Sequence, residues 1–192
     1  MGDAVLSKMM FPLTLWGCPL MALAALGCLF FCRGPGRRRL AWAAGVFLSA
    51  LALFFGGMVL LGFFGLTWRN LPSAVLCGVL LVSGWAGIVL TLNCLMPQAW
   101  PELAPVLRWT VKGGALLLSG VILFVTILYG PFFVAWGFGG GERVLEHQGQ
   151  TLLEVDESWL DPYYCCYAYH GPLVRGTERI WSGPTHIDGD IN

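Results

Sequence analysis

Four long runs of apolar residues constrain this chain more than any other feature of its sequence. They cover about residues 11–32, 40–68, 74–96 and 110–136. About 20 helical residues, each rising 1.5 Å, are enough to cross a hydrocarbon layer of ~30 Å. Only 11% of the 192 residues are charged, and the mean hydropathy is +0.71. A soluble single domain does not need so few charges or so high a hydropathy. The sequence therefore predicts a mainly α protein built on a four-helix transmembrane bundle.

The first run also allows an interpretation as a cleaved targeting signal. Its start is barely basic, with Lys8 alone, and the positive cluster that begins at Arg33 follows the run instead of preceding it. Cys28 comes after Ala25-Leu26-Gly27, which loosely resembles a lipoprotein cleavage box. Signal peptides combine a basic start with a shorter apolar run, so we expect this segment to remain as a helix.

The chain after the fourth run has a different character. Alternating and aromatic-rich stretches separated by turn residues predict four short strands, with a glycine turn between the first two. These stretches are 143–147, 150–155, 163–169 and 173–180. We expect them to form an antiparallel meander, with an irregular end from Ser182 to Asn192.

These patterns divide the chain into three parts. We expect a membrane domain at 1–136, a glycine-rich leash at 137–141 and an extracytoplasmic, acidic, β-rich tail at 142–192. The predicted fold class is thus a four-helix transmembrane bundle with a small C-terminal antiparallel β appendage.

Charge predicts the orientation of the spans. Residues 1–140 carry eight Lys or Arg against two acids, whereas residues 142–192 carry three Arg against nine acids. The second predicted connector carries only Arg69, whereas the first and third carry Arg33, Arg37, Arg38, Arg39, Arg108 and Lys112. Because basic loops stay in the cytoplasm, we expect a multi-pass protein of the plasma membrane with both termini outside.

The predicted spans carry almost no polar chemistry. No Asp, Glu, Lys, Arg or His lies near the centre of any apolar run, although ion-coupled carriers usually need such groups at mid-membrane depth. Asn93 is the most polar residue at depth. It would contact a substrate in a pore or make a hydrogen bond between helices, and the interhelical polar contact is the more ordinary use of one amide.

Two adjacent cysteines in the tail, Cys165 and Cys166, form a candidate redox pair. Neighbouring strand residues point to opposite faces, so the alternative is two unpaired thiols. The tail histidines and acids invite a metal-site interpretation, but their spacing matches no ligand motif. We therefore expect no metal and no cofactor. A nucleic-acid partner is also not expected, because the arginines lie in connectors.

Catalytic motifs are missing from the sequence. It has no serine nucleophile elbow, no phosphate-binding glycine loop and no His-Glu zinc motif, so we expect a protein that is not an enzyme. Tyrosine offers rigid contact area with a polar tip. The candidate partner-binding residues are Tyr163, Tyr164, Tyr167 and Tyr169.

One stretch of the tail carries a resemblance. Val-Leu-Glu-His-Gln-Gly-Gln is followed by the tyrosines and then by Gly171-Pro-Leu-Val-Arg-Gly176. This order, after apolar spans, resembles small uncharacterised multi-span membrane proteins of Gram-positive bacteria that have a short Tyr-rich C-terminal strand segment. The resemblance covers about 40 residues. It implies a bacterial plasma membrane and no particular mechanism.

Two classes of function fit these observations. The first is a non-enzymatic accessory, sensor or partner-binding membrane component, in which the tyrosine-rich tail meets another membrane protein. The alternative is a small transporter, channel or immunity-type protein that acts as a homo-oligomer. Membrane lipid is the one partner that both classes share.

Overall fold

The computed structural model describes residues 36–97, 104–138, 140–158 and 161–187. Two compact units divide these residues. The first contains residues 36–49 and Leu80–Ile127, and the second contains Ala50–Val79 and residues 128–187. The predicted span at 11–32 lies outside the described residues.

The prediction of a four-helix bundle is wrong. The described chain has three helical stretches together with a five-stranded antiparallel sheet, so it combines α and β structure. The sequence pattern overestimated the helical part because it treated apolar length as helix throughout. One strand of the sheet comes from the end of an apolar run.

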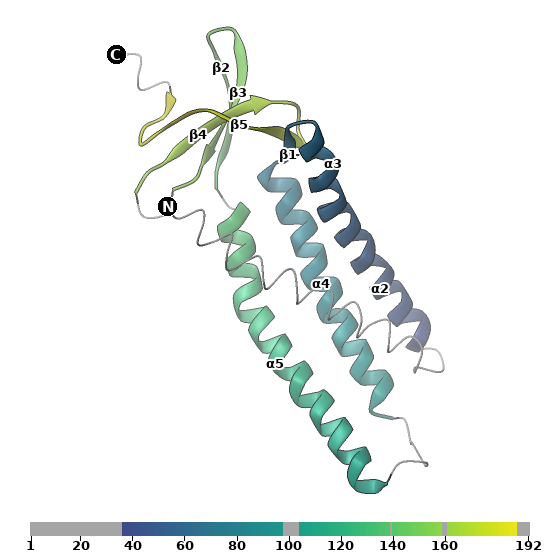
Figure 1. Cartoon of the computed structure of the whole chain (residues 1–192). Coiled ribbons are helices and arrows are strands. Elements are labelled where there is room, and N and C mark those ends of the chain that lie inside the picture. Colours follow the sequence, from purple (N-terminus) through teal and green to yellow (C-terminus); the bar gives the residue numbers. More distant parts are fainter. Residues whose placement is uncertain (1–35, 98–103, 139, 159–160, 188–192) are drawn as a thin grey trace. The chain divides into compact units, whose positions relative to one another are not determined.

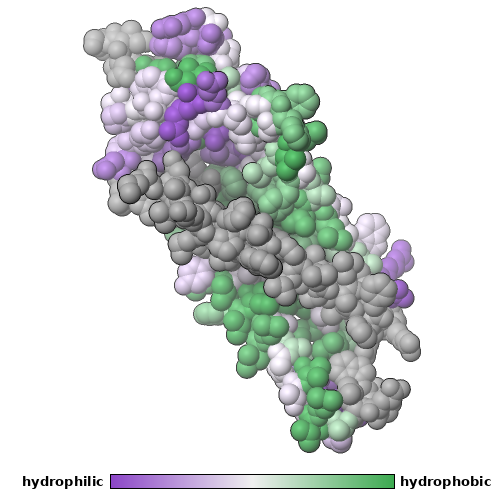
Figure 2. Space-filling view, viewed as in Figure 1, coloured by the Kyte–Doolittle hydropathy of each residue, from purple (hydrophilic) through white to green (hydrophobic). Residues whose placement is uncertain are grey.

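The three helical stretches are long and apolar enough to cross a membrane, by their length and composition. The first consists of α2 (Gly36–Leu51), the π-helical turn η1 (Ala52–Gly56) and α3 (Gly57–Phe63). The others are α4 (Asn70–Leu95) and α5 (Pro105–Phe138). Figure 2 shows hydrophobic side chains gathered over these helices. Among the 18 most apolar consecutive residues of each stretch, at most 17% are buried. Most of the apolar surface of the helices therefore lacks a protein partner in the described chain.

The first unit is held by a few specific contacts. On α2, Leu40, Ala44 and Phe47 are buried at helical spacing. Trp85 on α4 donates its indole N–H to Thr126 Oγ1 on α5 at 2.9 Å. This is an interhelical polar contact of the kind predicted for Asn93, made by different residues.

The sheet belongs to the second unit and has the order β1-β5-β4-β3-β2 (Figure 1). Its strands are β1 (Leu66–Trp68), β2 (Glu142–His147), β3 (Gln150–Asp156), β4 (Tyr164–Tyr169) and β5 (Val174–Gly183). The four strands predicted in the tail are present and pair antiparallel in sequence order, as expected. The fifth strand, β1, pairs with β5 and was not predicted.

β1 exists because the apolar run that contains it stops being helical at Phe63. Gly65 has φ +66°, a left-handed conformation that favours glycine and commonly ends a helix. The following Leu66-Thr67-Trp68 has strand propensity, and its register sets Leu66 opposite Gly176. The Trp68 ring lies so close to Gly57 on α3 that a side chain at Gly57 would overlap it. The loop between α3 and α4 is therefore part of the sheet.

An ion pair fixes the same loop to β2. The Arg69 guanidinium lies 2.8 Å from Glu142 Oε2, and the two side chains are only 15% and 9% exposed. Asn70, the first residue of α4, donates its N–H to Glu142 Oε1 at 2.9 Å. A carboxylate at a helix N-terminus satisfies an orphan donor and the helix dipole. Glu142 thus joins the tail strand to both the loop and α4.

Candidate functional site

The chemistry-bearing side chains of the second unit lie on two faces of the sheet. One face carries the apolar cluster of Leu153, Val155, Cys165 and Tyr167, with Tyr169 packed against it. The other carries Leu152, Cys166 and Ile187, with Leu145 and Trp181. We call these the Cys165 face and the Cys166 face. The two adjacent cysteines therefore lie in separate clusters, as the alternation of a strand requires.

The four candidate tyrosines do not form one surface. Tyr167 is buried on the Cys165 face, and Tyr169 on the same face is half-buried. Tyr164 stacks on His186 with ring centroids 4.1 Å apart, and Tyr163 is exposed. A partner-binding role for all four stays a prediction, in which Tyr163 is the most accessible member.

A polar cluster centred on Glu157 occupies the Cys165 face. Tyr167 donates its hydroxyl to Glu157 Oε1 at 2.6 Å, and the Cys165 thiol donates to Oε2 at 3.4 Å. Arg179 donates to the same Oε2 at 3.5 Å. The Arg175 guanidinium lies 4.0 Å from the centre of the Tyr167 ring. The carboxylate of Glu157 is thus shared among groups of its own sheet.

This cluster makes Cys165 a poor nucleophile. Burial, then the charge of Glu157, raises the pKa of the Cys165 thiol to about 12, and burial followed by the Glu157 hydrogen bond raises the pKa of Tyr167 to about 12. Reactive cysteines have the opposite shift, because the thiolate is the reactive form. The redox pair of Cys165 and Cys166 stays a prediction. It is not favoured by the raised pKa of the Cys165 thiol or by the position of the two cysteines on opposite faces of the sheet.

A second buried carboxylate, Glu154, lies on the Cys166 face and is 3% exposed. His186 Nδ1 lies 2.5 Å from Glu154 Oε1, and Ile187 donates its N–H to Oε2 at 3.2 Å. Arg143 Nε lies 3.9 Å from the same Oε1. A buried charge needs such partners. Glu154 therefore holds the segment around Ile187 against β3.

A histidine oriented by a carboxylate also occurs in catalytic and metal sites. Among the described residues, no group of three or more His, Cys, Asp or Glu side chains is arranged to hold a metal ion. The contacts of His186 in this structure are with Glu154 and Tyr164, which are both parts of the sheet's own packing.

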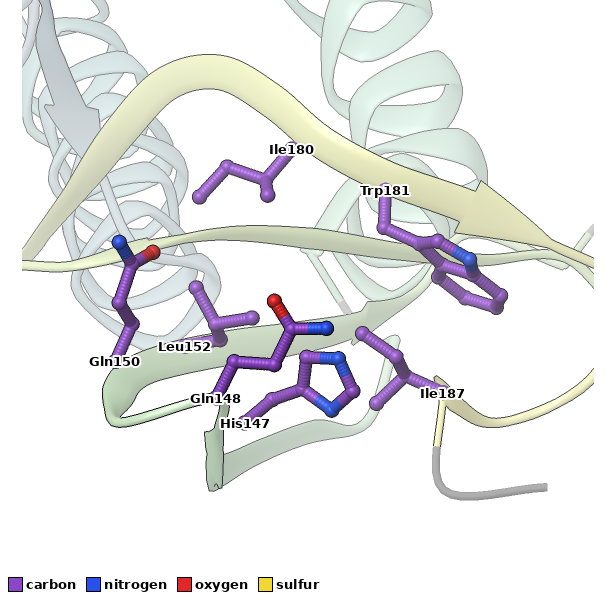
Figure 3. A pocket seen from close by; sticks show the side chains of 7 residues that line it. All are labelled: His147, Gln148, Gln150, Leu152, Ile180, Trp181 and Ile187. Atoms are coloured by element: carbon purple, nitrogen blue, oxygen red, sulfur yellow. The ribbon is translucent and has the colours of Figure 1, made fainter. Parts of the chain in front are cut away.

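A cavity of about 220 Å³ opens on the Cys166 face near the β2–β3 turn (Figure 3). Its polar lining consists of His147, Gln148 and Gln150. Its apolar lining consists of Leu152, Ile180, Trp181 and Ile187. These residues come from β2, the turn, β3, β5 and the segment after β5. The strands and the turn follow from the sequence pattern, but no motif in the sequence marks these seven residues as a set.

A bulge in β5 shapes the cavity. Cys166 pairs with Trp181 whereas Tyr167 pairs with Arg179, so Ile180 is an extra residue in β5. Such a bulge re-aims side chains. Residues two apart normally share a face, yet Arg179 joins the Cys165 face and Trp181 the Cys166 face. No motif in the sequence marks the bulge, because the stretch reads as a continuous strand.

Asn93 lies near the end of α4 and its side chain is exposed in the described chain. The predicted interhelical contact of Asn93 stays a prediction. The sheet is where the described structure concentrates its polar chemistry, and Figure 2 shows hydrophilic side chains over it.

Comparison with models of known protein families, with curated proteins and with solved structures finds no match.

The Glu157 cluster predicts a loss of stability in alkali. The pKa values of Cys165 and Tyr167 are raised above their ordinary values of 9 and 10, so the unfolded chain releases these protons first. Their stabilisation is complete below about pH 9. It is lost between about pH 9 and 12 for Cys165 and between about pH 10 and 12 for Tyr167, by up to about 1.4 kcal/mol per pH unit for each group. The measurement is the urea midpoint at which Cys165 becomes open to pulsed thiol labelling, taken across this pH range.

Tyr167→Phe should flatten part of this pH dependence, and Tyr164→Phe, on the other face, should leave it unchanged. A midpoint that is constant from pH 8 to about pH 11 in the unsubstituted protein would contradict the protonated cluster.

Proposed function

We propose that this chain is a non-enzymatic, multi-pass membrane protein that acts as an accessory or sensor component and binds a protein partner through its sheet. The proposal is supported by how the sheet uses its reactive groups. Glu157 bonds Tyr167, Cys165 and Arg179, and Glu154 bonds His186 and Ile187. Groups that are bonded to one another in this way stabilise a scaffold, and this use of the sheet's described acids, histidine and thiol supports a role other than catalysis.

We further propose that the sheet lies outside the cytoplasm, in a bacterial plasma membrane. Arg37, Arg38 and Arg39 occupy the first turn of α2, and Arg108 and Lys112 lie near the start of α5. The ends of α3 and α5 next to the sheet and the start of α4 carry one basic residue, Arg69, which is paired with Glu142. The positive-inside rule favours cytoplasmic placement of the more basic helix ends.

Reporter fusions in a bacterial host test this orientation. Alkaline phosphatase, which folds only outside the cytoplasm, should be active when it is fused after Asn192 and inactive when it is fused after Met96. Green fluorescent protein at the same two positions should give the opposite pattern. Activity of phosphatase after Met96 alone would overturn the proposed orientation.

The observation that carries the partner-binding proposal is the open edge of β2. In the described chain β2 pairs with β3 on one side and forms the edge of the sheet on the other. Asp156 donates its N–H to Gly141 C=O, so in the alternating antiparallel pattern Arg143, Leu145 and His147 bond β3. Glu142, Val144 and Glu146 direct their main-chain groups to the open side. An extended segment of a partner can add to such an edge as a further strand.

The charges on β2 disfavour a second copy of the chain as the added strand. Two antiparallel copies related by a two-fold axis must pair residues of the same face. Pairing centred on Val144 sets Glu142 opposite Glu146, and like charges directly opposite are destabilising. Pairing centred on Leu145 sets Val144 opposite Glu146. The β2 edge therefore suits a strand from a different protein better than a strand from a second copy of this chain.

Val144→Pro tests the edge with little disturbance of the sheet. Proline removes the Val144 N–H, which faces the open side, and is tolerated on edge strands where the N–H is not bonded. The tagged protein, purified from its native membrane in mild detergent, should carry a stoichiometric partner, and Val144→Pro should lower the recovered partner at least tenfold, about 1.4 kcal/mol of affinity.

Val144→Thr keeps the N–H and is the matched control, so it should retain the partner. Thermal unfolding of both variants checks that the sheet is intact. Purification of the unsubstituted chain alone, or equal recovery of the partner with Val144→Pro, would contradict binding through this edge.

A further inference from the structure

We propose that the cavity beside the β2–β3 turn binds one ring of a neutral saccharide, with Trp181 as the stacking surface and Gln148 as the main hydrogen-bonding group. This inference goes beyond partner binding at the β2 edge, because it concerns a small ligand on the Cys166 face. It is carried by the lining of the cavity and by three separate features that build it.

The lining selects a neutral ligand. None of the residues that line the cavity is Asp, Glu, Lys or Arg. Gln148 and Gln150 each offer an amide that both donates and accepts hydrogen bonds, and His147 adds an imidazole. A sugar hydroxyl also donates and accepts, so it matches these groups. A carboxylate or phosphate would meet no Lys or Arg in this lining.

The apolar side selects a ring with a flat C–H surface. Trp181 presents an indole beside the buried side chains of Leu152 and Ile187. Aromatic rings supply a large apolar contact area with a defined plane. The volume of about 220 Å³ is below the ~300 Å³ at which pockets for drug-sized molecules begin, so it suits a single ring.

The β5 bulge places Trp181 in this position. Ile180 is the extra residue, and it allows Trp181 to face Cys166 while Arg179 stays on the opposite face with Tyr167. Bulges are frequent beside binding sites because they re-aim one side chain. In a regular β5, Arg179 and Trp181 would share one face, and the cavity would have an arginine or lack its indole.

Gln148 is the second feature. It has φ +51°, and it is the only residue other than glycine with positive φ in the described chain. The two-residue turn with Gly149, at φ +77°, favours asparagine, aspartate or glycine at this position. A glutamine at this position has a conformational cost, and hydrogen bonding of its amide to a ligand would offset that cost. Figure 3 shows the Gln148 side chain extending over the cavity on the side where Trp181 lies.

The third feature is the wall formed by Ile187. Glu154 bonds the Ile187 N–H and His186, and so holds this segment against the sheet. Ile187 is 5% exposed and packs with Leu152 and Cys166. The cavity thus has a fixed floor and wall, and its amides lie at the rim, where a soluble ligand can exchange.

Saturation-transfer NMR on the full chain in nanodiscs tests the proposal. The probes are glucose, galactose, mannose, N-acetylglucosamine and their neutral disaccharides, each at about 10 mM, which is well above a ~1 mM dissociation constant. At least one should receive saturation on its ring C–H protons. N-acetyltyrosinamide serves as a neutral aromatic probe of the same size class.

Gln148→Gly separates binding from folding. Glycine suits positive φ, so the variant should melt at the same temperature or higher while it binds the saccharide at least tenfold more weakly. Trp181→Phe should keep part of the stacking and Trp181→Ala should lose it. Glu178→Gln, an exposed change on β5, is the matched control and should bind as the unsubstituted chain does.

Three results would overturn the proposal. They are the absence of saturation transfer to every saccharide, equal binding by Gln148→Gly, and transfer to N-acetyltyrosinamide without transfer to any sugar. The last would assign the cavity to an aromatic side chain of a partner.

Discussion

The ion pair between Arg69 and Glu142 connects the two kinds of structure in the second unit. Arg69 lies in a loop between two apolar helices, and Glu142 begins the first strand of the tail. Glu142 also accepts the N–H of Asn70 at the start of α4. Main-chain bonds reinforce the connection, from Arg69 to Leu173 and from Thr177 to Gly65. A small sheet has few buried residues of its own, so attachment to the helix ends supplies the support that it needs.

The three described helical stretches were predictable from the sequence, because a long apolar run is a strong signal. The residues at which these helices end were not predictable in the same way. The run at 40–68 is apolar throughout, yet the helix stops at Phe63 because Gly65 adopts a left-handed conformation and Trp68 packs on Gly57. Neither fact is visible in hydropathy. Strand β1 could not be predicted from local sequence, because its partner strand β5 lies more than 100 residues away along the chain.

The tail strands were predictable because their alternation and turn residues are local. The site was less so. Glu154 and His186 are 32 residues apart, and the bulge at Ile180 leaves no mark in the residue pattern. The tyrosines attracted attention by their density, but Tyr167 proves to be a core residue bonded to Glu157. The β2 edge and the cavity beside Trp181 are open features of the same sheet.

The central claim is that the helix-connecting loop and the tail form one sheet through Arg69 and Glu142. A double-mutant cycle of Arg69→Met and Glu142→Gln in nanodiscs tests it most directly, with amide hydrogen exchange at Arg69 and Thr177 as the readout. Each single change should reduce protection, with a coupling energy of at least about 1 kcal/mol, since the pair is largely buried. Unchanged protection in both single variants, or exchange at Thr177 as fast as in an open loop before any substitution, would contradict the account.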